Sequence, residues 1–265
     1  MANWCPHKDF IPMMILIHMI LVLYLLCSTC MSCPVGDTIL LVADSAVSLG
    51  GSFSSSFISL IRNVTDRRCN IVVEVESQNN WFARDILNNM NRILTVHKPT
   101  DIVLLVGTVD AARIYDELES EGNHGSDRHT KRKLTDYRLL LQDVVMTALL
   151  SNVNVTLSSP LVIGEKLRSN PYDYILEDVL GEILHVAIDF QLDFIDLRSV
   201  LLEEIEVLNR EDLKQGVITY DGMHFNSIGQ KIFADCLLTS IFNIVPNAEN
   251  NVNKRYSCAD SHEVL

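Results

Sequence analysis

The chain has 265 residues, of which 48% are hydrophobic and 21% charged, a size and composition that favour one globular domain with a sizeable core over two small domains. The formal net charge of −13 argues against nucleic acid or an anionic membrane face as the main partner. Beyond this, so acidic a composition predicts only that the protein is soluble.

The N-terminal segment is apolar. No Asp, Glu, Lys or Arg occurs between Asp9 and Asp37, and nearly every residue from Phe10 to Cys27 is hydrophobic, with small residues after it. The run is somewhat long for the core of a signal peptide and close to the lower limit of about 17 residues for a membrane span. We therefore expect residues 1–33 to be a cleaved signal peptide, which predicts a secreted protein, or an uncleaved signal anchor, which predicts a single-pass membrane protein.

Two weaker patterns suit the secretory pathway. Asn63-Val64-Thr65 and Asn154-Val155-Thr156 fit the acceptor pattern for an N-linked glycan, which predicts a glycoprotein. The cysteines that follow the apolar segment are available for disulfides, and the sequence does not choose among their pairings. These cysteines are Cys33, Cys69, Cys236 and Cys258. No set of cysteines and histidines has the spacing of a zinc site, so we expect neither a metal nor a cofactor.

Short apolar runs, mostly β-branched, recur after Gly36 and are typical of strands buried on both faces. Helical periodicity fills the gaps between most of them. The predicted strands are 38–43, 70–75, 101–106, 153–157 and 192–197. The predicted helices are 82–97, with Ile86, Met90, Ile93 and Leu94 on one face, 134–150, with Thr135 as a candidate cap, 172–190 and 227–242.

This alternation predicts an α/β fold with a five-stranded parallel sheet and helices on both faces. In such sheets a ligand binds beyond the carboxyl ends of the strands, so the loops there are the place to look for chemistry. Two stretches break the alternation. Residues 115–133 are polar and charged, and we expect a mobile surface insertion there; residues 244–265 lack apolar periodicity, and we expect a disordered tail.

Ser45 lies directly after the first predicted strand, on the turn into a helix. A serine there presents its hydroxyl at the carboxyl edge of the sheet, and its backbone N–H points into the cleft beside a helix N-terminus. The simpler alternative is that Asp44 or Ser45 only caps the helix that follows.

Asp221 and His224 are three residues apart, after the last predicted strand. The Asp221–Gly222 pair favours a tight turn, across which the two side chains face the same way. A serine hydroxyl requires a base to attack a carbonyl group, and the base requires an acceptor that orients it; this pair supplies both. The alternative is a capped helix beside an incidental Asp and His. In either case the expected cap is Asn226, and the expected anchors are Phe225 and Ile228.

With these motifs the chain resembles the SGNH (GDSL-type) hydrolases, over about residues 37–243. The G-D-S block of that family appears as Ala43-Asp44-Ser45, and its D-x-x-H block as Asp221-Gly222-Met223-His224, followed by Gly229 in the next helix. The resemblance implies a flavodoxin-like three-layer α/β/α fold and ester hydrolysis through an acyl-enzyme. It also implies that Ser45 is the nucleophile, His224 the general base and then acid, and Asp221 the residue that orients His224.

Two middle blocks of the family are altered in this chain. Its G-x-N-D block reads Gly107-Thr108-Val109-Asp110, so Val109 replaces the asparagine whose side chain helps to form the oxyanion hole. By spacing, Asn80 takes the place of a glycine, which leaves the N–H groups of Ser45 and Asn80 as the candidate oxyanion hole. We hypothesise that the side chain of Asn79 or Asn80 replaces the lost donor, because one donor is worth on the order of 3 kcal/mol.

The sequence thus predicts a secreted or membrane-anchored serine esterase that acts on a small-molecule, lipid or acetylated-sugar ester. One alternative is a catalytically impaired SGNH-like pseudoenzyme or binding module, which Val109 favours. Another is an acyltransferase that uses the same triad. No nucleic-acid partner is expected, and membrane contact is expected only through residues 1–33 if they stay attached. Trp81 and Phe82 are expected mainly to pack, near the mouth of the cleft.

Overall fold

The computed structural model describes residues 38–44, 59, 61, 72–76, 81–122, 127–168 and 170–242. The chain divides into two units, Met1–Val35 and Gly36–Leu265, and every described residue lies in the second. The predicted signal peptide or anchor at 1–33 and the predicted tail at 244–265 lie outside the described residues. Within the described ranges, no helix is both long and apolar enough to span a lipid bilayer.

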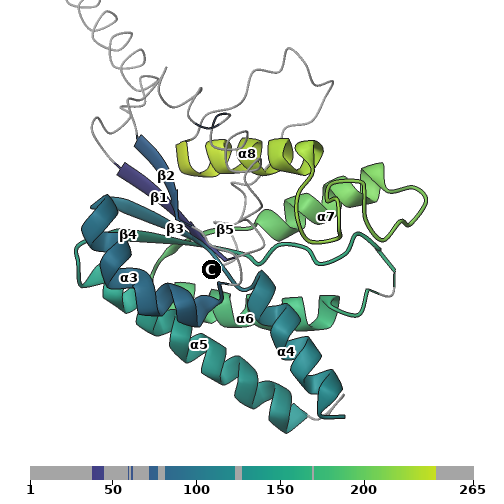
Figure 1. The fold of residues 1–265 in the computed structure, drawn as a ribbon, viewed down its shortest axis with the longest axis horizontal. Coiled ribbons are helices and arrows are strands. Elements are labelled where there is room, and N and C mark those ends of the chain that lie inside the picture. The colour runs from purple at the N-terminus through teal and green to yellow at the C-terminus, as the bar shows by residue number, and fades with distance from the viewer. Residues whose placement is uncertain are drawn as a thin grey trace, which may run out of the picture. The chain divides into compact units, whose positions relative to one another are not determined.

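A five-stranded parallel sheet forms the centre of the fold, in the order β2-β1-β3-β4-β5 (Figure 1). Its strands are β1 (Thr38–Ala43), β2 (Val72–Glu76), β3 (Asp101–Leu105), β4 (Asn154–Ser158) and β5 (Asp193–Ile195). All five were predicted from their apolar runs. β5 is shorter than the predicted 192–197, because Asp196 accepts a hydrogen bond from the N–H of Ser199 and begins a helix there.

Both faces of the central strands are buried. Leu40 and Val42 of β1 pack with Ile102 and Leu104 of β3 in the main hydrophobic cluster. The side chains between them alternate to the other face, and Leu41, for example, is also buried. This burial on two faces is why the strands appear in the sequence as continuous apolar runs.

Helices cover the two faces of the sheet (Figure 1). The helices α3, α5 and α6 lie on one face, with α4 beside them, and α7 and α8 lie on the other. Their bounds are α3 (Ala83–His97), α4 (Thr108–Ser120), α5 (Asp127–Leu149), α6 (Asp173–Phe190), α7 (Leu197–Leu208) and α8 (Ser227–Phe242). The predicted α/β class and three-layer α/β/α arrangement are therefore confirmed.

The prediction of a mobile insertion at 115–133 is wrong. The helix α4 continues to Ser120, and α5 begins at Asp127. The polar side chains here form ion pairs: the Glu117 carboxylate lies 2.8 Å from Arg113 and 2.7 Å from Lys133. Hydrogen bonds from Lys133 and Arg113 hold the pKa of Glu117 below its usual range. A helix with few apolar residues is stabilised by such pairs.

The N-terminus of α5 also differs from its prediction. Thr135 is not a cap but lies inside the helix, where its hydroxyl donates to the carbonyl of Lys131 at 2.8 Å. The apolar residues on which the prediction of 134–150 was based belong to the part of α5 that packs in the core. The helix itself begins earlier, at Asp127 in the polar segment.

Candidate active site

Asp44 follows β1 and joins the ends of two strands. Its side chain is fully buried, and its Oδ2 accepts hydrogen bonds from the N–H groups of Thr108 at 3.1 Å and Val109 at 3.2 Å. These N–H groups belong to the first turn of α4, where a helix favours negative charge. Asp44 therefore caps α4, which follows β3, and this contact holds the first turn of α4 beside the end of β1.

The segment from Gly107 to Asp110 is fitted tightly between β3 and α4. Gly107 has φ = 105°, and a Cβ atom there would lie 2.8 Å from the Tyr137 hydroxyl, so the position requires glycine. The Thr108 hydroxyl accepts the N–H of Leu161 at 2.8 Å, which ties this segment to the loop after β4. Asp110 Oδ2 accepts the N–H of Ala83 at 3.0 Å, at the start of α3.

Asp221 and His224 form the pair that their spacing predicts. His224 Nδ1 lies 2.5 Å from Asp221 Oδ2. Asp221 Oδ1 accepts the N–H groups of Met223 at 3.0 Å and His224 at 2.8 Å. Burial raises the pKa of Asp221, but the hydrogen bonds from His224 and Met223 outweigh it and hold that pKa below its usual value. An ionised Asp221 keeps the proton of His224 on Nδ1, so Nε2 is the nitrogen that can accept one.

The turn between the two residues relies on Gly222, which has φ = 94°. After the pair, Asn226 caps α8 as predicted, because its Oδ1 accepts the N–H groups of Ile228 at 2.9 Å and Gly229 at 3.2 Å. Phe225 is buried, as expected of an anchor, but Ile228 is 51% exposed and is not one.

Tyr220 is a neighbour of the pair that the sequence analysis did not single out. Its ring stacks on the His224 imidazole, with 5.7 Å between centroids and 18° between planes. Partial burial, and then the Asp221 carboxylate, raise the pKa of its phenol. The only signal for it in the sequence is an aromatic residue directly before Asp221.

Ser45, Asn79 and Asn80 lie outside the described residues. The contact between Ser45 and His224 and the oxyanion hole of Ser45 and Asn80 therefore stay predictions. Trp81 is buried in the main core, so its expected packing role is confirmed. Phe82 is only half-buried and faces a groove.

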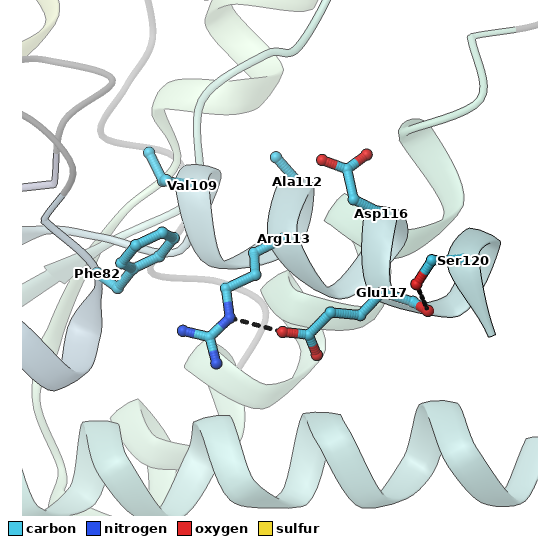
Figure 2. A pocket seen from close by; sticks show the side chains of 7 residues that line it. All are labelled: Phe82, Val109, Ala112, Arg113, Asp116, Glu117 and Ser120. Atoms are coloured by element: carbon cyan, nitrogen blue, oxygen red, sulfur yellow. Dashed lines mark hydrogen bonds and ion pairs between the residues drawn. The ribbon is translucent and has the colours of Figure 1, made fainter.

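This groove runs along one side of α4 and has a volume of about 460 Å³ (Figure 2). Phe82 and Val109 lie at one end and Ser120 lies at the other. The Arg113 guanidinium stands 5.1 Å over the Phe82 ring and bonds to Glu117 at 2.8 Å. The groove thus begins at Val109, the position at which the sequence pattern predicted an altered oxyanion block.

Comparisons with known proteins agree with this architecture. No family model and no curated protein matches the sequence. Among solved structures, the acetyl xylan esterase AlAXEase is similar to this chain, with a TM-score of 0.66, 24% identity, and coverage of 77% of this chain and 99% of that one. The acetylxylan esterase Axe2 from Geobacillus stearothermophilus is also similar, with a TM-score of 0.62, 18% identity, and coverage of 78% and 95%.

The chain has the SGNH hydrolase fold. Within this fold, the ends of β1 and β3 and the loop before α8 are the places where the serine, oxyanion and histidine blocks were predicted. The described residues hold the ends of β1 and β3 together through Asp44, and they form the Asp221–His224 pair. They contain no group of three His, Cys, Asp or Glu residues arranged to bind a metal ion.

Proposed function

We propose that the protein is a serine esterase that hydrolyses carboxylic esters through Ser45, His224 and Asp221. The observation that carries the proposal is the hydrogen bond between Asp221 and His224. It lies in the loop before α8 of an SGNH fold, and it fixes the imidazole in the tautomer that a general base requires.

In the proposed reaction, Ser45 Oγ attacks the carbonyl carbon of the ester while its proton passes to His224 Nε2. The tetrahedral intermediate collapses when His224 returns that proton to the leaving alcohol, and the acyl group stays on Ser45. Water then attacks the acyl-enzyme with the same proton transfers, which releases the carboxylic acid and restores Ser45. Asp221 keeps Nδ1 protonated and stabilises the imidazolium that forms twice in the cycle.

For the substrate, we propose an acetylated sugar. AlAXEase and Axe2 are named as acetyl xylan esterases, and the SGNH fold of this chain spans nearly the whole of both. The groove beside Val109 is also lined by Asp116, Glu117 and Arg113, whose side chains exchange hydrogen bonds with hydroxyl groups. A polyhydroxylated alcohol suits such a groove.

Val109 supports a second candidate, a binding module with little turnover. Its side chain has no donor, and its backbone N–H already bonds to Asp44. The position at which SGNH hydrolases place an oxyanion donor therefore offers none here. Loss of one such donor lowers the rate by about 10²–10³, which leaves a weak enzyme or a protein that only binds.

A fluorophosphonate probe separates the two candidates. We expect the full-length protein to be labelled and the Ser45→Ala variant not to be labelled. Asp221→Asn, which keeps the shape of the side chain but favours the wrong tautomer of His224, is expected to lower the turnover of p-nitrophenyl acetate by about 10³–10⁴. Failure to label a folded wild-type sample would reject the esterase and support the binding module. Acetate release from acetylated xylo-oligosaccharides, compared with a phospholipid ester, tests the substrate class.

A further inference from the structure

A buried carboxylate, that of Glu165, holds the loop that carries the Asp221–His224 pair. Glu165 lies in the loop between β4 and α6, and its side chain is only 1% exposed. The groups that donate hydrogen bonds to its carboxylate all lie in the segment 217–219, some 50 residues further along the chain and shortly before the catalytic pair.

Four hydrogen bonds converge on this carboxylate. Its Oε2 accepts the N–H of Val217 at 2.7 Å. Its Oε1 accepts the N–H of Ile218 at 2.7 Å, and the N–H and hydroxyl of Thr219 at 2.5 and 2.7 Å. A carboxylate accepts several donors at once, which a neutral amide of the same shape does not, because its NH₂ would face the donors.

The backbone N–H and the backbone carbonyl of Glu165 are both hydrogen-bonded. Its N–H donates to the carbonyl of Lys214 at 2.9 Å. Its carbonyl accepts the side-chain amide of Asn209 at 2.7 Å, and the same amide group also bonds to Leu213 at 2.9 Å. The carboxylate therefore projects from a fixed backbone.

The contact is passed on to the catalytic turn through Thr219. The Thr219 hydroxyl that donates to Glu165 also accepts the N–H of Gly222 at 3.0 Å. The carbonyl of Gly222 accepts the N–H of Gly164, the residue next to Glu165, at 2.5 Å. Gly222 directly follows Asp221. Its carbonyl is thus held by the β4–α6 loop directly, and its N–H is held through the Thr219 hydroxyl, which itself bonds to Glu165.

The base of the turn is closed at the same place. Thr219 and Phe225 form an isolated antiparallel bridge, and the residues between them include the catalytic pair. Apart from that bridge, residues 209–226 contain no helix or strand, so their backbone N–H groups need acceptors in turns or on side chains. Several bond within the segment, but those of Val217, Ile218 and Thr219, directly before the turn, donate to Glu165.

We propose that Glu165 is a positioning residue of the active site, which fixes Asp221 and His224 through Thr219 and the peptide of Gly222. This inference rests on the proposed esterase function for its kinetic readout. Glu165 touches neither His224 nor the reacting atoms in this scheme, and it acts only on the geometry of the groups that do. Misplacement of a catalytic group by about 1 Å costs about 10² in rate.

The test uses the full-length protein and four variants. Glu165→Gln keeps the volume but turns an NH₂ group toward the donors. Thr219→Val removes the hydroxyl that links Glu165 to Gly222, and Thr219→Ser restores it. Val145→Ala is the control for lost stability, because Val145 is buried in α5, in a main hydrophobic cluster that does not include Glu165 or Thr219.

Two readouts are made on samples shown to be folded by circular dichroism. The first is kcat and KM for p-nitrophenyl acetate. The second is the far-downfield proton resonance of the Nδ1–H that His224 shares with Asp221, which reports the pair without turnover. We expect Glu165→Gln and Thr219→Val to lower kcat by about ten- to a hundredfold at similar KM, and to broaden or shift the resonance. Thr219→Ser and Val145→Ala are expected to keep both.

The proposal is overturned if folded Glu165→Gln and Thr219→Val keep the wild-type kcat and resonance. It is also overturned if their losses merely follow the loss of melting temperature, as calibrated by Val145→Ala. If Glu165→Gln does not fold, the Thr219→Val and Thr219→Ser pair decides. If the wild type shows no turnover that depends on Ser45, the esterase has failed, and the resonance alone decides whether Glu165 positions the pair.

Discussion

Val109 lowers the expected rate of the proposed reaction, because its side chain cannot donate to an oxyanion. It occupies the first turn of α4, where its N–H is held by Asp44 at 3.2 Å, and its side chain lines the groove. An amide at this position would point a donor into the same space without disturbing the Asp44 contact, because that contact uses only the backbone.

We therefore predict that Val109→Asn raises kcat for p-nitrophenyl acetate by about tenfold or more, toward the 10²–10³ that one oxyanion donor is worth. Val109→Asp is the matched control, because it has the same shape but no donor when ionised, and it should not raise kcat. Steady-state kinetics on both variants checks this. Equal kcat values for Val109→Asn and the wild type would show that the oxyanion is held from another direction.

Asp110, next in the chain, carries a pH-dependent cost of folding. Burial raises its pKa from 3.8 to about 6, and the N–H of Ala83 offsets this only in part. A raised folded-state pKa means that stability is greatest below the unfolded value and falls as pH rises through about 6. Two pKa units correspond to about 3 kcal/mol.

Asp110→Asn keeps an acceptor for Ala83 and removes the charge. We predict that this variant is more stable than the wild type by up to about 3 kcal/mol at pH 7.5, and that the difference shrinks toward zero near pH 4. Urea unfolding at both pH values measures it. The exposed Asp116→Asn should change stability little at either pH. A difference for Asp110→Asn that does not vary with pH would contradict the explanation.

At the residue scale, the sequence revealed Asp221, His224 and Asn226, because their spacing within one turn is itself the pattern. Glu165 and Tyr220 left no such pattern. The contacts of Glu165 reach across 52 to 54 positions of the chain, and only the fold brings its carboxylate to Thr219. Asp44 caps a helix that begins 64 residues later, a contact that no local pattern indicates. The helix directly after Asp44, which it was predicted to cap, lies outside the described residues.

The elements were predicted where hydrophobicity alone determines them. The strands are buried on both faces and leave apolar runs, and α3, α6 and α8 pack apolar faces on the sheet. The helix α4 and the first turns of α5 were missed. Ion pairs such as Glu117–Lys133 stabilise the polar part of this region, and a polar helix resembles a loop in composition. The helix α7 was missed because its apolar residues follow β5 without a gap.

Gly229 in α8 tests how closely this helix approaches the catalytic loop. A Cβ atom there would overlap the carbonyl oxygen of Ile218 and lie 2.7 Å from the Phe225 ring. We predict that Gly229→Ala lowers the free energy of unfolding by about 1–3 kcal/mol and also lowers kcat, because Ile218 bonds to Glu165 and must move.

Gly181→Ala in α6 is the matched control, since nothing lies within 4 Å of a Cβ atom at that position. This substitution should raise stability by about 0.5–1 kcal/mol, because alanine loses less backbone entropy than glycine in a helix, and it should leave kcat unchanged. Thermal unfolding and kinetics on both variants check the pair. A Gly229→Ala variant that gains stability as Gly181→Ala does would show that α8 is packed more loosely than the structure indicates.

At the scale of the whole molecule, the fold class followed from the alternation of strands and helices, and the edge of the sheet that carries the site followed from the fold class. The localisation of the protein does not follow from its fold. We propose that it enters the secretory pathway. Its support is the apolar segment at 1–33, the two glycan acceptor sequences, and the disulfide of Cys236, which is typical of an oxidising compartment. The bonded cysteine opposite Cys236 lies outside the described residues.

The disulfide gives this proposal a measurable consequence. Cys236 is buried in α8, the helix that follows the catalytic loop. We predict that dithiothreitol lowers the free energy of unfolding of the wild type by about 2–4 kcal/mol, since the crosslink no longer restricts the unfolded chain. Cys236→Ser should be destabilised to a similar degree and should not respond to dithiothreitol. Wild-type protein from an oxidising compartment that melts at the same temperature with and without reductant would reject a stabilising disulfide and remove its support for the secretory route.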